Sequence, residues 1–147
     1  MKIETKITEI THDDLVNLIS TAWEGSCWLG INYNDRDYKP LKNDDDSYED
    51  KVARILLAGK SIEMSDYLAE GEHYGSLPFN FDEEDNDTVI YTVTLEDIKR
   101  GLGKAFSSQN YISTYAHHLI EDDGVQLDQP EAEALMQYIL FGEEIYG

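Results

Sequence analysis

Apolar residues along the chain recur with two spacings, one typical of helices and one typical of strands. After Thr11, which can cap a helix, they recur every three or four positions up to Gly25. The same spacing predicts helices that begin after Ser47, Thr94 and Asp128. The segment 110–123 has tyrosine, isoleucine and threonine content that suits a strand, but its apolar spacing favours a further helix.

Alternating or continuous apolar runs predict four strands. They lie at residues 2–9, at "CWLGINY" (27–33), at "KSIEMSDY" (60–67) and at "DTVIYTV" (87–93). The stretch "NDRDYKPLKNDDDSYED" (34–50) is polar and is interpreted as a long connection. Helices and strands mix without the regular alternation of a doubly wound sheet, which predicts an α+β fold. We expect a small antiparallel sheet of three to four strands packed by three to four helices, in a single domain over residues 1–147.

The most unusual feature of the composition is its strongly negative net charge. The chain carries 31 acidic and 11 basic side chains, a formal net charge of −20, while 41% of its residues are hydrophobic, as in a folded globule. Up to Lys60 the net charge is −4 (12 acids, 8 bases), and beyond it −16 (19 acids, 3 bases). Such a field repels nucleic acids and anionic membranes and attracts basic surfaces. We therefore expect neither nucleic acid nor membrane as a direct ligand.

The acidic excess is concentrated in three clusters among the predicted elements. A globule of this length has a radius of gyration of roughly 15 Å, hence a diameter of about 38 Å, and a DNA duplex of that length bears about 22 phosphate charges. The net charge of −20 is similar in size. Tyrosines near the acids, at positions 67, 74, 91, 111 and 115, could add apolar anchoring. The candidate partner-binding residues are Asp82, Glu83, Glu84, Asp85 and Asp87, then Glu121, Asp122 and Asp123, and finally Asp44, Asp45 and Asp46.

Motifs for catalysis or metal binding are weak in this sequence. "GSCW" around Cys27 follows a predicted helix end and lacks the preceding glutamine of a cysteine protease, so the thiol is interpreted as a strand residue. From Asp82 the calcium-loop template fails at its glycine and glutamate positions, which leaves only an irregular calcium site open. His117 and His118 are adjacent and cannot share a metal from one helix face. We predict no catalytic residue, no metal and no cofactor; a cleft gathering His73 or His117 with carboxylates would instead indicate a small enzyme.

The compartment and the context follow from weaker signals. A single cysteine gives no sign of disulfide chemistry, and neither a signal peptide nor a membrane span is evident, so we expect a cytoplasmic protein. "ITHDDLVNLISTAWEG" (10–25) and "EAEALMQYILFGEEIYG" (131–147) resemble the ends of a group of small acidic proteins from phages and mobile elements of Gram-positive bacteria. The insert at 34–49 departs from that group. The resemblance implies a context in which acidic proteins inhibit host nucleases, including DNA-mimicking antirestriction and anti-CRISPR proteins.

These observations lead to one functional expectation and one alternative. The chain is expected to be a non-enzymatic inhibitor that blocks the DNA- or RNA-binding surface of a host defence nuclease by imitating nucleic acid. The alternative is an acidic adaptor or regulator that binds a basic partner without such mimicry, which an exposed apolar patch would favour.

Overall fold

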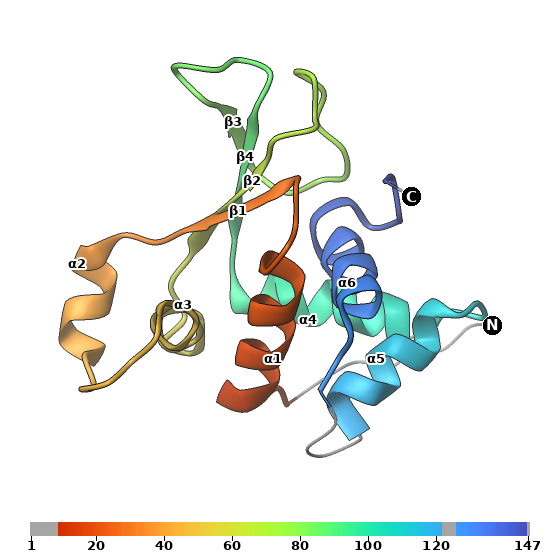
Figure 1. Cartoon of the computed structure of the whole chain (residues 1–147), viewed down its shortest axis with the longest axis horizontal. Coiled ribbons are helices and arrows are strands. Elements are labelled where there is room, and N and C mark those ends of the chain that lie inside the picture. Colours follow the sequence, from red (N-terminus) through yellow and green to blue (C-terminus); the bar gives the residue numbers. More distant parts are fainter. Residues whose placement is uncertain (1–8, 122–125, 147) are drawn as a thin grey trace.

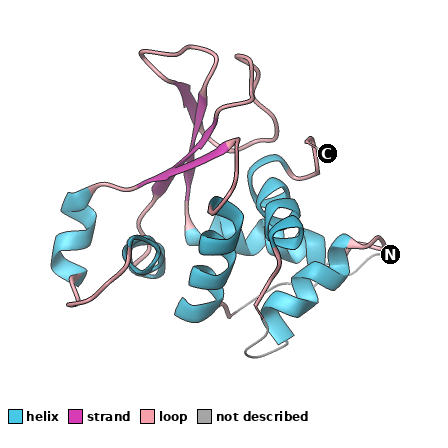
Figure 2. Ribbon diagram, viewed as in Figure 1, coloured by secondary structure: helices cyan, strands magenta, loops and turns pink. Residues whose placement is uncertain are grey.

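A computed structural model describes residues 9–121 and 126–146 and shows an α+β arrangement (Figures 1 and 2). Helices α1, α3, α4, α5 and α6 gather on one side of a four-stranded sheet, and the short helix α2 lies next to α3, beyond the end of β1. The elements are α1 (His12–Trp23), β1 (Leu29–Asn32), α2 (Asp35–Tyr38), the 3-10 turn η1 (Lys39–Leu41), α3 (Tyr48–Leu57), β2 (Ile62–Asp66), β3 (Phe79–Phe81), β4 (Val89–Val93), α4 (Leu95–Phe106), α5 (Ile112–Glu121) and α6 (Gln129–Phe141).

Four of the helices begin with a reciprocal capping box. In each, the side chain of the capping residue accepts a hydrogen bond from the third helical N–H, and the third residue's carboxylate accepts one from the cap's backbone. These bonds satisfy backbone donors that a helix start otherwise leaves unpaired, and the carboxylates also complement the helix dipole. The pairs are Thr11 with Asp14, Ser47 with Asp50, Thr94 with Asp97 and Asp128 with Glu131.

The sheet is antiparallel throughout, with strand order β1-β2-β4-β3. Its two faces differ, because successive side chains of a strand point to opposite sides. Ile62, Met64 and their cross-strand partners Val93 and Tyr91 are buried against the helices. The other face carries two rows of cross-strand neighbours, of which only the glycine is buried. The first row is Gly30, Ser65, Ile90 and Asn80, and the second is Asn32, Glu63 and Thr92. Within the described chain this second face is open to solvent except at Gly30, over which the Tyr67 ring lies.

Close packing of α4 on α6 completes the core. Gly101 lies on α4 where a side chain would meet the backbone of Ile139: a Cβ atom there would stand 2.4 Å from the Ile139 Cα. The absence of a side chain therefore lets the two helices approach each other. Leu102 and Leu135 on the same two helices are fully buried in the cluster that joins helices and sheet.

The predicted fold class is confirmed, and so are the helices at α1, α3, α4, α5 and α6 and the strands at β1, β2 and β4. Two interpretations were wrong. The segment 34–50 is not simply a loop, because Asn34 caps the short helix α2 and Pro40 lies in the 3-10 turn that follows. Between the strands predicted at 60–67 and 87–93, where no regular element was expected, the structure has a further strand, β3. The predicted strand at 2–9 falls almost wholly outside the described residues.

Candidate protein-binding surface

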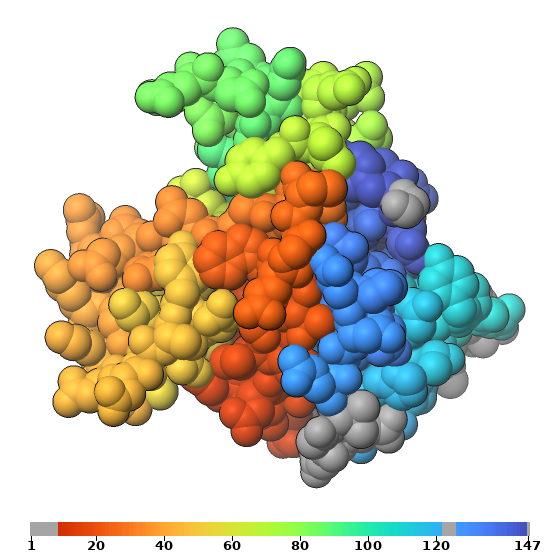
Figure 3. Space-filling model, viewed as in Figure 1, coloured from red at the N-terminus to blue at the C-terminus, as the bar shows by residue number. Residues whose placement is uncertain are grey.

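The acidic run 82–87 forms the turn of the β3–β4 hairpin, which projects from the body of the protein (Figure 3). Two of its carboxylates order the turn. Asp82 Oδ1 accepts a hydrogen bond from the Glu84 N–H at 2.8 Å, and Asp85 accepts from the Asp87 N–H and the Thr88 hydroxyl, both at 3.1 Å. Because the turn is held by its own side chains, its exposed carboxylates have defined positions along the hairpin.

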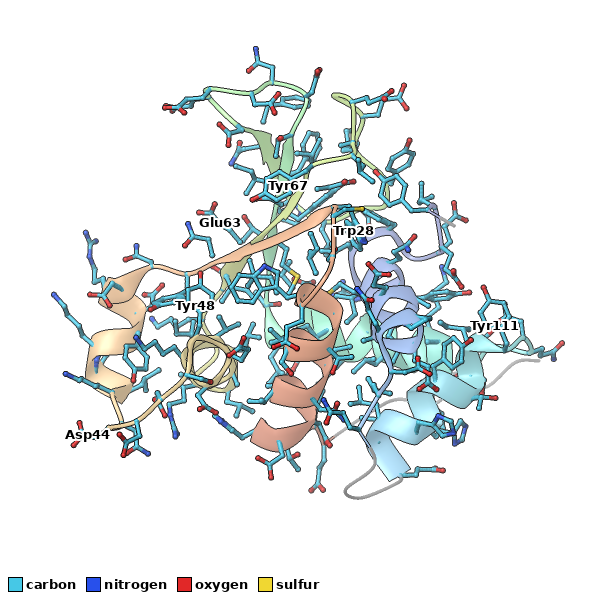
Figure 4. The ribbon with its side chains drawn as sticks, viewed as in Figure 1. Trp28, Asp44, Tyr48, Glu63, Tyr67 and Tyr111 are labelled. Carbon is cyan, nitrogen blue, oxygen red and sulfur yellow. The ribbon has the colours of Figure 1, made fainter. Side chains whose placement is uncertain are left out.

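A shallow groove of about 860 Å³ runs from this turn over the open face of the sheet. Figure 3 shows the molecular outline indented between the green hairpin and the orange segment that holds α2, and Figure 4 shows Glu63 at the strands on that side. Four of the lining side chains are carboxylates, and among the described residues that line the groove none is lysine or arginine. The lining residues are Glu63, Asn80, Phe81, Asp82, Glu83, Glu84, Ile90 and Thr92.

Glu63 was missed by the sequence analysis. It is one of two acids in "KSIEMSDY", and its alternation with Ile62 and Met64, which places it on the exposed side of β2, was the only local signal. It joins the hairpin acids because β2 and β3 flank β4 on either side. Asp87, in contrast, is exposed in the turn but does not line the groove.

The second cluster lies elsewhere. Asp44 is at the lower left of Figure 4, at the opposite end of the molecule from the hairpin, and it and Asp45 are exposed. Asp46 is taken up inside the protein: Arg54 donates to its two oxygens at 2.8 and 3.1 Å, and the Tyr38 hydroxyl donates at 2.7 Å. The hydrogen bonds from Arg54 hold the pKa of Asp46 below its usual value. We therefore assign Asp46 to the anchoring of the α2–α3 connection and not to a binding surface.

Replacing Asp46 with asparagine is expected to lower the thermal midpoint at pH 7. Since the pKa of Asp46 is lowered in the folded state, its contribution is present above the pKa of an unfolded carboxyl and is lost as the pH falls through the folded value. The deficit of Asp46→Asn should therefore shrink in acid. Thermal unfolding of both proteins between pH 2 and 7 measures it, and a deficit that stays constant with pH would contradict this role.

The third cluster is only partly within the described chain. Glu121 ends α5, and its carboxylate lies 2.8 Å from the His117 Nδ1. Asp122 and Asp123 lie outside the described residues. In Figure 1 the end of α5 is at the bottom of the view and the hairpin is at the top. The described members of the three clusters thus lie in three separate parts of the molecule, and among them the hairpin acids share a groove with a further carboxylate, Glu63.

A share of the acidic side chains serves the fold directly. The four capping boxes use one carboxylate each at the third helical position, Asp46 pairs with Arg54, and Asp66 is fully buried. Asp50 also lies 2.8 Å from the His12 Nε2, a contact that lowers the pKa of Asp50. These groups cannot act as a surface array, so net charge alone overstates the acidity offered to a partner.

The tyrosines near the acids have different environments. Tyr91 is completely buried, with its hydroxyl accepting from the Tyr74 N–H at 2.9 Å, so it is no anchor for a partner. Tyr67 and Tyr111 are 55% and 57% exposed. Tyr67 lies over Gly30 and covers the β1 end of the second sheet face, whereas Tyr111 is hydrogen-bonded to Glu144 away from the hairpin (Figure 4).

Neither His73 nor His117 lines the smaller cleft of the described chain. This cleft of about 240 Å³ between α4, α6 and residues 75–77 is lined by Asp97, Arg100 and Lys104 with mainly apolar neighbours. His73 stacks on Phe79, with ring centroids 3.9 Å apart, and His117 stacks on Phe106, with ring centroids 3.7 Å apart. In residues 9–121 and 126–146 no three His, Cys, Asp or Glu side chains converge as metal ligands, and no helix there has the length and apolarity to span a membrane.

Comparison of the chain with protein-family models, curated proteins and solved structures gives no significant match. No relative therefore supplies a role for any of these residues.

Proposed function

We propose that this protein is a non-enzymatic, cytoplasmic inhibitor that blocks the basic nucleic-acid-binding surface of a host defence nuclease. The binding surface is the acidic groove, defined as Glu63 on β2 together with Asp82, Glu83 and Glu84 of the hairpin. Its mechanism is exclusion of DNA or RNA, with carboxylates taking the place of phosphates and long-range attraction speeding the encounter.

The groove is the observation that supports this proposal. Four carboxylates face one hollow without a lining lysine or arginine, and two hydrogen-bonded turns fix the hairpin part of the array. Carboxylates at the surface repel one another only weakly in water and salt, so the protein can hold this array without a partner, and a basic surface is attracted to it. The proposed binding surface is limited to the groove, because Asp44, Asp45 and Glu121 lie far from it and a partner that covers the groove need not reach them (Figures 1 and 4).

The alternative function, an acidic adaptor for a basic protein that does not bind nucleic acid, is favoured by one observation. Phe81 is 45% exposed and lines the groove beside the acids. Duplex DNA offers no aromatic ring at its outer surface, so a contact on Phe81 would belong to protein recognition of a more general kind.

Neutralising the hairpin is expected to weaken inhibition at least tenfold. The variant carries Asp82→Asn, Glu83→Gln and Glu84→Gln; it leaves Asp85, which ties the turn to Thr88, in place. Asparagine at position 82 keeps the oxygen that accepts from the Glu84 N–H. DNA cleavage by a panel of purified RNA-guided nucleases and restriction endonucleases, at 50 and 300 mM salt, measures the inhibition.

The matched control removes the same charge elsewhere, with Asp44→Asn, Asp45→Asn and Glu143→Gln, all at exposed positions. It should inhibit like the parent protein, and excess competitor DNA and high salt should relieve inhibition in both. Equal losses in the two variants would show that only total charge matters. No inhibition across the panel would reject the nuclease assignment.

A further inference from the structure

The open face of the sheet presents side chains and no unpaired strand. β2 and β4 are hydrogen-bonded on both sides, and the groove crosses them on the way to the hairpin. An added strand would pair at the outer edge of β1 or β3, beside the groove and not over it. An element that covers this face must satisfy its own backbone hydrogen bonds, as an α-helix does.

The positions of the carboxylates define a spacing. Glu63 on β2 is the cross-strand partner of Thr92 on β4. The Asp82 N–H donates to the carbonyl of Thr88, which directly precedes β4 and lies four residues before Thr92. Four residues of strand span about 13 Å, and the two strand separations between β2 and β3 add about 10 Å at right angles. The two ends of the acidic groove are therefore about 16 Å apart on the diagonal.

Between these two ends the face is apolar or uncharged. Ile90 is half-buried on β4, midway between Thr92 and Thr88, with Ser65 and Asn80 as its cross-strand neighbours. A ligand that fits has one cation at each end and an apolar middle. Eleven residues of α-helix rise about 16.5 Å in about three turns, which returns the side chain to the same face.

We propose that the open sheet face binds an amphipathic basic helix of the partner, with arginine or lysine at positions i and i+11. One cation pairs with Glu63, the other with Asp82 to Glu84, and apolar residues at i+4 and i+7 rest on Ile90. This inference rests on the proposed function, since it names the element of the nuclease that the acidic groove covers. A basic helix that the nuclease uses to contact the phosphates of DNA or RNA is then covered and cannot bind them.

Two synthetic peptides test the spacing. Each is a capped, alanine-based 20-mer with two arginines and with leucine at positions 8 and 11. In the first the arginines are at 4 and 15, on one face; in the second they are at 4 and 13, on opposite faces. Circular dichroism shows whether both are equally helical. Titration of the full ¹⁵N-labelled chain, followed by NMR, gives the affinity and the binding surface.

We expect the first peptide to bind at least fivefold more tightly, with shifts concentrated in β2, β4 and the hairpin. Glu63→Gln should abolish the preference, while Glu143→Gln, the same substitution at an exposed site in the C-terminal tail, should keep it. Equal affinity for the two peptides, tighter binding of a non-helical proline-containing version, or shifts confined to other surfaces would overturn the helix inference.

The two proposals fail separately. Nuclease inhibition that depends on the hairpin acids, without a preference between the peptides, would leave the inhibitor proposal standing and reject the helix. Spacing-dependent peptide binding without inhibition of any nuclease in the panel would support the helix and favour the adaptor function.

Discussion

Alanine at position 101 is expected to destabilise the protein by about 2 kcal/mol, within the range of overpacked cores, although alanine favours helix over glycine by about 1 kcal/mol. The added methyl would stand 2.4 Å from the Ile139 Cα and 2.9 Å from its backbone N, so α4 and α6 must move apart. That movement loosens the packing around Leu102 and Leu135, which are fully buried on these helices. Urea unfolding at pH 7 measures the change in the free energy of unfolding.

Two controls separate the clash from general effects of substitution. Arg100→Ala, at the neighbouring position, removes an exposed guanidinium from its ion pair with Asp97. It should cost less than about 1 kcal/mol, because Asp97 keeps its hydrogen bonds from the Thr94 N–H and hydroxyl. Ile139→Ala should not rescue Gly101→Ala, because the closest contacts are to backbone atoms and not only to the Ile139 side chain. Rescue by Ile139→Ala, or a stability gain from Gly101→Ala alone, would refute this account of the helix packing.

The sequence predicted those parts of the fold in which local signals agree. Four helix starts were predictable because the capping residue and its partner lie only three positions apart in the chain; the caps are Thr11, Ser47, Thr94 and Asp128. β4 was recognised from five consecutive β-branched and aromatic residues. β3 has three residues and follows Pro78, so its pairing with β4 depends on tertiary contacts that no local pattern carries.

The candidate site was predictable only in part for a similar reason. The acids at 82–87 are visible as a run, and the structure orders them in a turn. Glu63 reaches them only because β4 lies between β2 and β3, a strand order that the sequence does not reveal. Conversely, the run 44–46 reads as one patch, yet the third of its carboxylates turns inward to Arg54 and Tyr38. A charge cluster in sequence thus divides between fold and surface according to tertiary partners.

The C-terminal tail is bonded to the buried carboxyl group of Asp66, and Tyr146→Phe is expected to cost about 1–3 kcal/mol, because it leaves a buried acceptor without its partner. The Tyr146 hydroxyl donates to Asp66 Oδ2 at 2.7 Å, and the Leu68 N–H donates to Oδ1 at 3.0 Å. Gln137 adds bonds from its Oε1 to the N–H groups of Ile145 and Tyr146, at 2.7 and 2.8 Å. Urea unfolding of the variant measures the loss, and an unchanged stability would contradict it.

The pH dependence of this site should run opposite to that of Asp46. Burial raises the pKa of Asp66 despite the hydrogen bonds from Tyr146 and Leu68, which favour the carboxylate. The folded state therefore holds its proton more tightly than the unfolded chain, whose carboxyl titrates near pH ~3.9. Between these two pKa values the protein loses about 1.4 kcal/mol of stability for each unit of rising pH, and above the folded pKa this contribution is constant.

Asp66→Asn removes that titration and keeps one acceptor oxygen in the core. Relative to the parent protein, the free energy of unfolding of Asp66→Asn should increase as the pH rises from about 4. That of Asp46→Asn should decrease relative to the parent as the pH rises through the acid range, because the pKa of Asp46 is lowered. Unfolding curves of the three proteins at matched pH values decide the matter. Parallel pH profiles for the parent protein and Asp66→Asn would mean that the Asp66 carboxylate ionises as easily in the core as in water, because the bonds from Tyr146 and Leu68 then offset the whole cost of its burial.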